Sequence, residues 1–119
     1  MAIGMVSFAT DAAAVAGIGA ETLSGETFFI SPQGGMAITD IFQTPGAVLA
    51  NDSDWTLMID GIATRFNWTA EELDPAAFAA AGGRLSTPIT IRPGALVQLA
   101  WAGQGAAQAN LLKLMYQTR

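Results

Sequence analysis

The segment "RLSTPITIRPGALVQLAW" constrains the fold of this chain more than any other. Apolar and polar side chains alternate over residues 84–91 and again over 95–101, which predicts two β-strands. The apolar positions are Leu85, Ile89 and Ile91 in the first strand, and Val97, Leu99 and Trp101 in the second. Pro93-Gly94 between them is typical of a type II turn, and a tight hairpin there would place the two apolar sets on opposite sides. We therefore expect the chain to cross to a second sheet, so that both sets enter one core of an all-β, antiparallel β-sandwich.

A β-hairpin is predicted over residues 54–68, "DWTLMIDGIATRFNW". Asp60-Gly61 favours a two-residue type I′ turn, because both central residues of that turn need a positive φ. The turn sets a register in which opposed side chains share one face of the hairpin. The pairs expected on the core side are Ile59 with Ile62, Leu57 with Thr64, and Trp55 with Phe66.

Further strands are expected where apolar residues alternate. They cover residues 26–31, 36–44 and 109–117. The last of these could also form a helix, but a terminal strand fits the regular spacing of the strands better. In the strand expected at 36–44, the residues predicted to share one face are Met36, Ile38 and Phe42.

A helical pattern replaces the strand pattern after the hairpin. Thr69–Glu72 matches a capping box, and Asp74-Pro75 is a second helix start. Gly82-Gly83 would end the helix. One short helix is therefore predicted between strands.

Residues 1–25 are rich in alanine and glycine and differ from the rest of the chain. Asp11 could cap a helical turn, although the glycines weaken a helix, and an extended arm on a neighbouring molecule fits equally well. We expect an N-terminal arm over 1–25 and a single β-sandwich domain over 26–119.

Charged residues make up only 13% of the chain, whereas average soluble proteins contain about 25%. So little charge leaves apolar surface, which usually marks contact with other chains, and we expect a homo-oligomer. The basic residues are scattered and the net charge is −5, which argues against a nucleic-acid partner. The apolar runs are too short for a membrane span and the start lacks basic residues, so no membrane partner and no signal peptide are expected.

Histidine and cysteine are both missing from the sequence, which removes the usual nucleophile–base pairs and thiolate metal sites. Glu71, Glu72 and Asp74 could suggest a carboxylate-dependent hydrolase, but acids are also favoured in the first turn of a helix. The polar stretch 51–54 lacks the glycine and distal glutamate of a calcium loop. Lys113 could be a perturbed amine, yet a lysine on an apolar strand more often snorkels. We expect neither enzymatic activity nor a cofactor or metal.

Aromatic residues suggest a second class of function, because flat rings on a β-sandwich can stack on sugars. Trp55 and Trp101 fall on predicted core faces. Trp68 lies just before the helix start, where it could be exposed or could act as a hydrophobic staple. A carbohydrate-binding module that uses Trp68 and Tyr116 is therefore the alternative function.

The segments "DWTLMIDGIATRFNW" and "GGRLSTPITIRPGALVQLAW", with the Ala/Gly-rich start, resemble small accessory virion proteins of tailed phages and phage-like particles. These belong to the capsid-decoration, cement or head-spike class. Within them, "STPITIRPGALVQL" looks like a strand–turn–strand unit of viral jelly-roll modules. The resemblance implies a jelly-roll-like β-sandwich that forms symmetric oligomers and docks on a capsid shell of the virion, assembled in the host cytoplasm. It carries over no catalytic or binding residue.

Outward-facing apolar residues of the predicted strands are the candidate partner contacts. An oligomer with closed symmetry would cover them. They are Leu96, Ala100 and Met115, to which Trp68 and Tyr116 are added as possible ligand or partner contacts.

Overall fold

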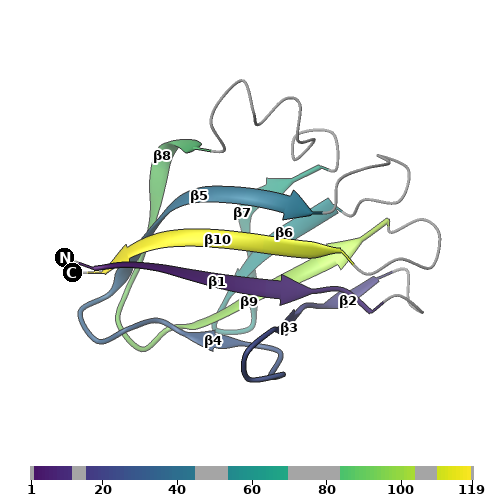
Figure 1. Cartoon of the computed structure of the whole chain (residues 1–119), viewed down its shortest axis with the longest axis horizontal. Helices are drawn as coiled ribbons and strands as arrows, with labels where there is room; N and C mark the ends of the chain where they lie inside the picture. The colour runs from purple at the N-terminus through teal and green to yellow at the C-terminus, as the bar shows by residue number, and fades with distance from the viewer. Residues whose placement is uncertain (1, 12–15, 45–53, 70–83, 104–109, 119) are drawn as a thin grey trace.

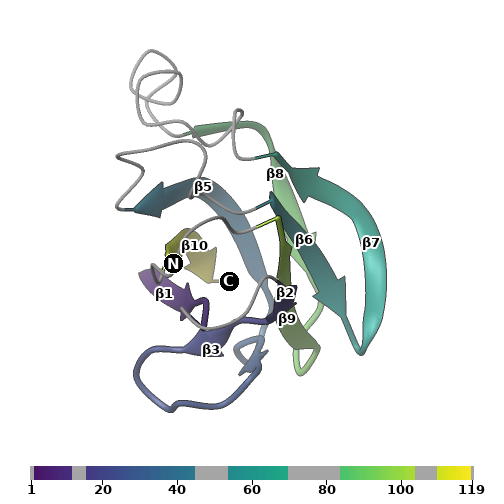
Figure 2. The same ribbon diagram turned by 90° about the vertical axis from the view of Figure 1, so that its right-hand side faces the viewer.

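The computed structural model describes residues 2–11, 16–44, 54–69, 84–103 and 110–118. They form two antiparallel β-sheets that lie face to face with one core between them (Figures 1 and 2). The strands are β1 (Ile3–Ala9), β2 (Ala16–Ile18), β3 (Ala20–Glu21), β4 (Phe29–Ile30), β5 (Met36–Thr44), β6 (Asp54–Ile59), β7 (Ile62–Trp68), β8 (Arg84–Ile91), β9 (Leu96–Ala102) and β10 (Leu111–Thr118). The predicted all-β, antiparallel class is confirmed, and the arrangement is sandwich-like.

Strands from distant parts of the sequence lie side by side in both sheets. Sheet A has the order β3-β1-β10-β5-β8, and sheet B has the order β2-β9-β6-β7, with β4 also paired to β9. The two ends of the chain meet in sheet A (Figure 1). There the Thr118 amide donates to the Ala2 carbonyl at 2.8 Å, and the Ala2 amide donates to Thr118 Oγ1 at 3.2 Å.

The connection from β8 to β9 crosses from sheet A to sheet B, as the sequence predicts. Gly94 has a φ of 73°, and the Ala95 amide donates to the Arg92 carbonyl at 3.4 Å, as in a type II turn. The buried residues contributed from the two sides of this turn are Ile89, Ile91, Val97, Leu99 and Trp101. Both apolar sets therefore reach one core.

Trp55 lies at the centre of that core and is 1% exposed. Its ring centroid lies 6.3 Å from that of Trp101, with the two planes tilted by 50°. Its indole N–H donates to Gln43 Oε1 at 2.8 Å, and the Gln43 side chain is buried as well. The hydrogen bond satisfies polar groups that would be costly to bury alone. The predicted core positions of Trp55 and Trp101 are confirmed.

The hairpin of β6 and β7 has the predicted turn but a different register. Asp60 and Gly61 have φ values of 54° and 79°, which confirms the type I′ turn. Ile59 pairs with Ile62 as expected, although Ile62 is 71% exposed rather than in the core. Further along, Trp55 pairs with Trp68, so the predicted Trp55–Phe66 pair is wrong.

A β-bulge at Thr64 causes this change of register. The Thr64 hydroxyl donates to the Leu57 carbonyl at 2.8 Å and accepts a hydrogen bond from the Phe66 amide at 3.1 Å. A side chain thus replaces part of the backbone ladder, so β7 uses more residues than β6 over the same length. Residues beyond the bulge are displaced along the partner strand, which is how Trp68 comes to lie opposite Trp55.

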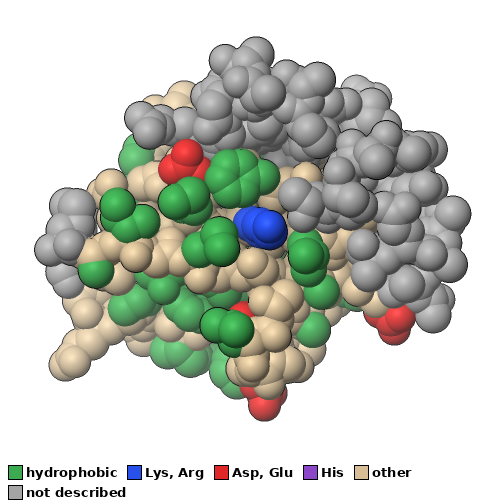
Figure 3. Space-filling model, viewed as in Figure 1, with side chains coloured by type: hydrophobic (Ala, Val, Ile, Leu, Met, Phe, Trp, Pro, Cys, Tyr) green, Lys and Arg blue, Asp and Glu red, His purple; other side chains and the backbone are tan. Residues whose placement is uncertain are grey.

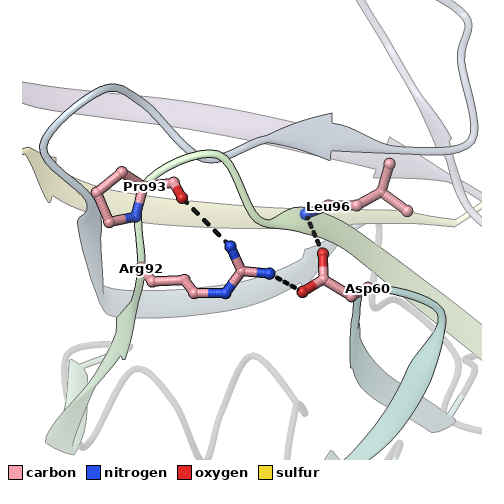
Figure 4. Close-up of polar contacts among 4 residues, drawn as sticks. All are labelled: Asp60, Arg92, Pro93 and Leu96. Carbon is pink, nitrogen blue, oxygen red and sulfur yellow. Dashed lines mark hydrogen bonds and ion pairs between the residues drawn. The ribbon is translucent and has the colours of Figure 1, made fainter.

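Asp60 also ties the hairpin turn to the β8–β9 turn (Figure 4). Its amide donates to the Leu96 carbonyl at 2.8 Å, and its Oδ1 accepts from the Leu96 amide at 3.0 Å. Its Oδ2 forms an ion pair with Arg92. The Leu96 amide and, to a lesser extent, the Arg92 guanidinium hold the pKa of Asp60 below its ordinary value.

The lowered pKa of Asp60 predicts a pH-dependent stability. A carboxyl whose pKa is lower in the folded state stabilises the fold above its unfolded pKa of about 4, and the stabilisation is lost as the pH falls through the folded pKa. We expect Asp60→Asn to unfold at lower urea concentration than the wild type at pH 7, and the difference to shrink below about pH 4. Arg92→Gln should have a smaller effect, because it leaves the Leu96 contact in place. A difference that stayed constant from neutral to acid pH would contradict a role for ionised Asp60.

β5 contains a second β-bulge, which changes the side chains that face the core. Thr39 is an extra residue between the paired positions Ile38 and Asp40. Beyond it the alternation shifts by one residue, so that Ile41 is buried and Phe42 turns to the outer side of sheet A. The predicted core position of Phe42 is wrong, because a period-two pattern does not reveal an inserted residue.

Part of the segment 1–25 forms regular strands. β1 lies between β3 and β10 in sheet A, and Val6 and Phe8 belong to the core. β2 and β3 are extended as well and belong to different sheets. The helical turn considered after Asp11 falls partly on residues 12–15, which lie outside the described residues.

The other predicted elements have mixed outcomes. The strands expected at 36–44, 84–91 and 109–117 are confirmed as β5, β8 and β10, whereas the strand expected at 26–31 is limited to Phe29–Ile30. The short helix predicted after Thr69 lies outside the described residues. Within the described ranges, no helix has the length and apolar character needed to cross a membrane.

Candidate interaction surface

The outer face of sheet A is apolar over three neighbouring strands, β1, β10 and β5. Side chains that alternate with the buried ones point outward from these strands. We call them the A face, which consists of Ile3, Met5, Ser7, Ala9, Ala37, Asp40, Phe42, Leu111, Lys113, Met115 and Gln117. Ile3 is 70% exposed and Met5 is 56% exposed. Figure 3 shows hydrophobic side chains gathered over this face with little charge between them.

The apolar character of the A face follows from the sequence of its strands. β1 reads IGMVSFA and β10 reads LLKLMYQT, so apolar residues occupy both inward and outward positions. An antiparallel sheet with one face in water usually alternates apolar and polar residues. Apolar residues on both faces are instead expected where the outer face contacts another molecule.

Two charged residues lie close together on the A face. Lys113 is opposite Phe42, and Met115 is opposite Asp40, so Asp40 and Lys113 occupy diagonal positions. Sheet geometry separates such diagonal neighbours by roughly 7–8 Å. Both side chains are half-buried, and within the described ranges neither forms an ion pair or a hydrogen bond.

A hollow of about 490 Å³ opens on the A face beside Asp40. It forms where β8 leaves regular pairing, because Ile38 pairs with Ile89 whereas Asp40 pairs with Arg84. More residues of β8 than of β5 span this stretch, so β8 bends away from its partner. The hollow is lined by Asp40, Thr39, Ser86 and Gln117 and by the apolar residues Ile3, Leu85, Pro88 and Met115. It therefore combines apolar walls with a carboxylate, hydroxyls and an amide.

The four residues predicted as contacts lie in different parts of the molecule. Met115 is on the A face and lines the hollow. Leu96 is half-buried on the outer side of sheet B, where its amide bonds to Asp60. Tyr116 points inward and is half-buried, with its ring 5.7 Å from that of Phe29. The structure therefore does not bring the four together.

Trp68 is 9% exposed and belongs to the core cluster, so exposure, one of the two alternatives that the sequence left open for this residue, is not found. The Thr64 bulge places it opposite the buried Trp55. A sugar-stacking platform needs an exposed ring face. Trp55 and Trp101 are also buried, so no tryptophan of the chain offers such a platform.

Sequence reasoning misses Ile3 and Met5 as surface residues, because it treats the whole N-terminal segment as an arm. A signal was present in the alternation of β1. Val6 and Phe8 are the large inward residues of this strand, and the positions between them point outward. The alternation therefore marks positions 3 and 5 as outward.

The buried carboxylate of Glu21 has a structural role. Its oxygens accept hydrogen bonds from the amides of Leu23, at 2.8 Å, and Ser24, at 3.0 Å. The Leu23 contact is the main reason why the pKa of Glu21 lies below its ordinary value. The Gly25 amide donates to the Glu21 carbonyl at 2.7 Å. Glu21 thus closes the turn that follows β3.

The other acids considered for chemistry are mostly outside the described residues. These are Glu71, Glu72 and Asp74, together with residues 51–53 of the polar stretch. Asp54 is exposed at the start of β6. In the part of the chain that the structure describes, no group of acidic residues is placed to hold a metal ion.

Comparison with known proteins found no family model, no curated protein and no solved structure that matches this chain.

Proposed function

We propose that this protein is a structural, non-enzymatic component of a virion or a similar particle, which forms a homo-oligomer and docks on a protein shell. It would stabilise or decorate a capsid assembled in the host cytoplasm. The observation that carries the proposal is the apolar A face, on which Ile3 and Met5 are largely exposed. In water this surface is unfavourable, and contact with protein removes it from water.

The order of the strands supports a jelly-roll as the finer description of the fold. With β4 counted as the edge strand of sheet B, β1-β10-β5-β8 faces β4-β9-β6-β7. Along these eight strands the chain changes sheets at every connection except the β6–β7 hairpin. Two sheets wound in this way are typical of jelly rolls, a fold common in viral capsid proteins and lectins.

The low charge of the chain also supports a role inside an assembly. Soluble monomers usually keep a well-charged surface, whereas charged residues make up 13% of this chain. Interfaces are depleted of charged residues at their centres and enriched in aromatic residues and methionine. Phe42, Met5 and Met115 on the A face fit that composition.

The test of this function is whether the chain sediments with particles in its natural source. Material from that source would be separated on a density gradient, and the chain and the most abundant shell protein would be quantified by mass spectrometry. We expect the chain in the particle fractions at a constant ratio to the shell protein. If it were confined to the soluble fractions in all preparations, docking on a shell would be refuted.

A further inference from the structure

We propose that the A face is a two-fold self-interface, in which Lys113 of one copy enters the hollow beside Asp40 of a second copy. The proposal rests on the oligomeric part of the proposed function and names the surface that forms the oligomer. Charge complementarity carries it. The described charged side chains of the A face are one base and one acid, and neither has a partner within the described ranges.

The A face does not share the negative charge of the chain as a whole. The net charge of the whole chain is −5, so two copies repel each other on average. On β1, β10 and β5 the outward charged residues are Asp40 and Lys113, whose charges cancel, and Arg84 of the adjacent β8 is the backbone partner of Asp40 and adds one base. The A face therefore lacks the negative charge of the chain as a whole, and two copies that meet there can form ion pairs between chains.

The hollow has the chemistry of a lysine site. Ile3, Pro88 and Met115 provide apolar walls for an aliphatic stem. The Asp40 carboxylate, with the polar side chains of Thr39, Ser86 and Gln117, offers oxygen acceptors for an ammonium group. Each of the two half-buried charges, which have no partner among the described residues, would gain one in the second copy.

Two-fold symmetry specifies which other residues meet. In such an interface, if residue i contacts residue j of the second copy, then j also contacts i. The two-fold axis that places Lys113 against Asp40 of the other copy lies between the two A faces. It crosses the midpoint of the line that joins Lys113 and Asp40 within one copy. Met115 and Phe42 occupy the other diagonal of the same four-residue unit. They therefore lie beside the axis, where each packs against its own counterpart.

Charge reversal tests the proposed ion pair. Lys113→Glu would set acid against acid at both contacts of the dimer, and Asp40→Lys would set base against base. We expect each variant to raise the dimer dissociation constant at least tenfold, as measured by sedimentation velocity over a concentration series. A 1:1 mixture of the two variants should restore dimers, because both contacts then join opposite charges. Restoration by mixing requires contacts between chains and cannot arise within one chain.

Matched controls carry the same charge changes away from the A face. They are Arg65→Glu on exposed β7 and Glu26→Lys in the exposed segment before β4. Both should dimerise like the wild type. The proposal is overturned if the reversed variants associate as tightly as the wild type, or if the mixture stays monomeric while circular dichroism shows that each variant is folded.

Disulfide trapping tests the position of the axis without reversing a charge. The chain contains no cysteine, so a single introduced thiol reports on one position. Met115→Cys should form a covalent dimer under mild oxidation at least tenfold faster than Ala63→Cys, which places the thiol on exposed β7. A disulfide requires Cβ atoms about 3.5–4.5 Å apart, which a residue beside the axis can provide. Equal rates for the two variants would refute this interface.

The same samples separate this inference from the proposed function. A wild-type chain that stays monomeric at all concentrations but sediments with particles refutes the self-interface and leaves docking in place. Dimers that trap through Met115→Cys but never join a particle support the self-interface and refute docking.

Discussion

Replacing Trp55 with alanine is expected to lower the free energy of unfolding by about 4 kcal/mol. Trp55 is 1% exposed, packs beside Trp101 and bonds to Gln43. The substitution removes a large buried ring and also takes the indole donor from a buried amide oxygen. Since domains are typically stable by only about 5–15 kcal/mol, this is a large part of the total. Urea unfolding followed by circular dichroism measures the change.

Trp55→Phe separates the two contributions. It keeps most of the ring volume but removes the N–H that Gln43 accepts. We expect a loss of about 2 kcal/mol, because a buried polar atom that loses its partner costs about 1–3 kcal/mol. If Trp55→Ala cost less than about 1 kcal/mol, below the range for emptying a core site, the described position of this ring would be wrong.

The second large effect is expected at Gly19, where the chain passes from β2 in sheet B to β3 in sheet A. Gly19 is buried, and its amide donates to the Leu99 carbonyl at 2.7 Å. A Cβ at this position would lie 2.9 Å from the Cβ of Phe8 and 3.2 Å from the Leu99 carbonyl oxygen. Because neither atom is at the flexible end of a side chain, the sheets themselves would have to shift. We expect Gly19→Ala to lower the free energy of unfolding by about 3 kcal/mol, at the upper end for overpacking.

Gly25→Ala is the control for the general cost of replacing a glycine. Gly25 has a φ of 76°, and a Cβ there would meet no atom within 4 Å. The free energy of unfolding should fall by only about 1 kcal/mol, because an alanine at this positive φ strains the backbone. Urea midpoints for both variants give the comparison. An effect at Gly19 no larger than that at Gly25 would mean that the two sheets do not approach as closely as described.

The candidate surface was predicted from the sequence only in part. Met115 was identified as an outward apolar residue, and it lies on the A face. Ile3 and Met5 were not, although they are largely exposed on the same face. The membership of the A face depends on which strands are neighbours in the sheet, and β1 and β10 come from opposite ends of the chain. Local alternation cannot show that they form one surface.

Two features were determined by the sequence itself. The type I′ turn at Asp60-Gly61 and the crossing at Pro93-Gly94 follow from local backbone preferences together with the alternation on either side. Both depend on residues that are neighbours in the chain, so the sequence contains all the information they need.

Only the tertiary structure decided the register beyond the two bulges. Thr39 moves Phe42 out of the core, and the Thr64 bulge sets Trp68 instead of Phe66 opposite Trp55. An inserted residue is tolerated when a partner strand and a side-chain hydrogen bond compensate for the broken ladder, and that partner is distant in sequence. The one-residue insertion at Thr39 reverses which side chains meet water beyond it, because strand side chains alternate from one face to the other. The bulge at Thr64 shifts the pairing by two residues, so it changes the partners across the hairpin and keeps the faces.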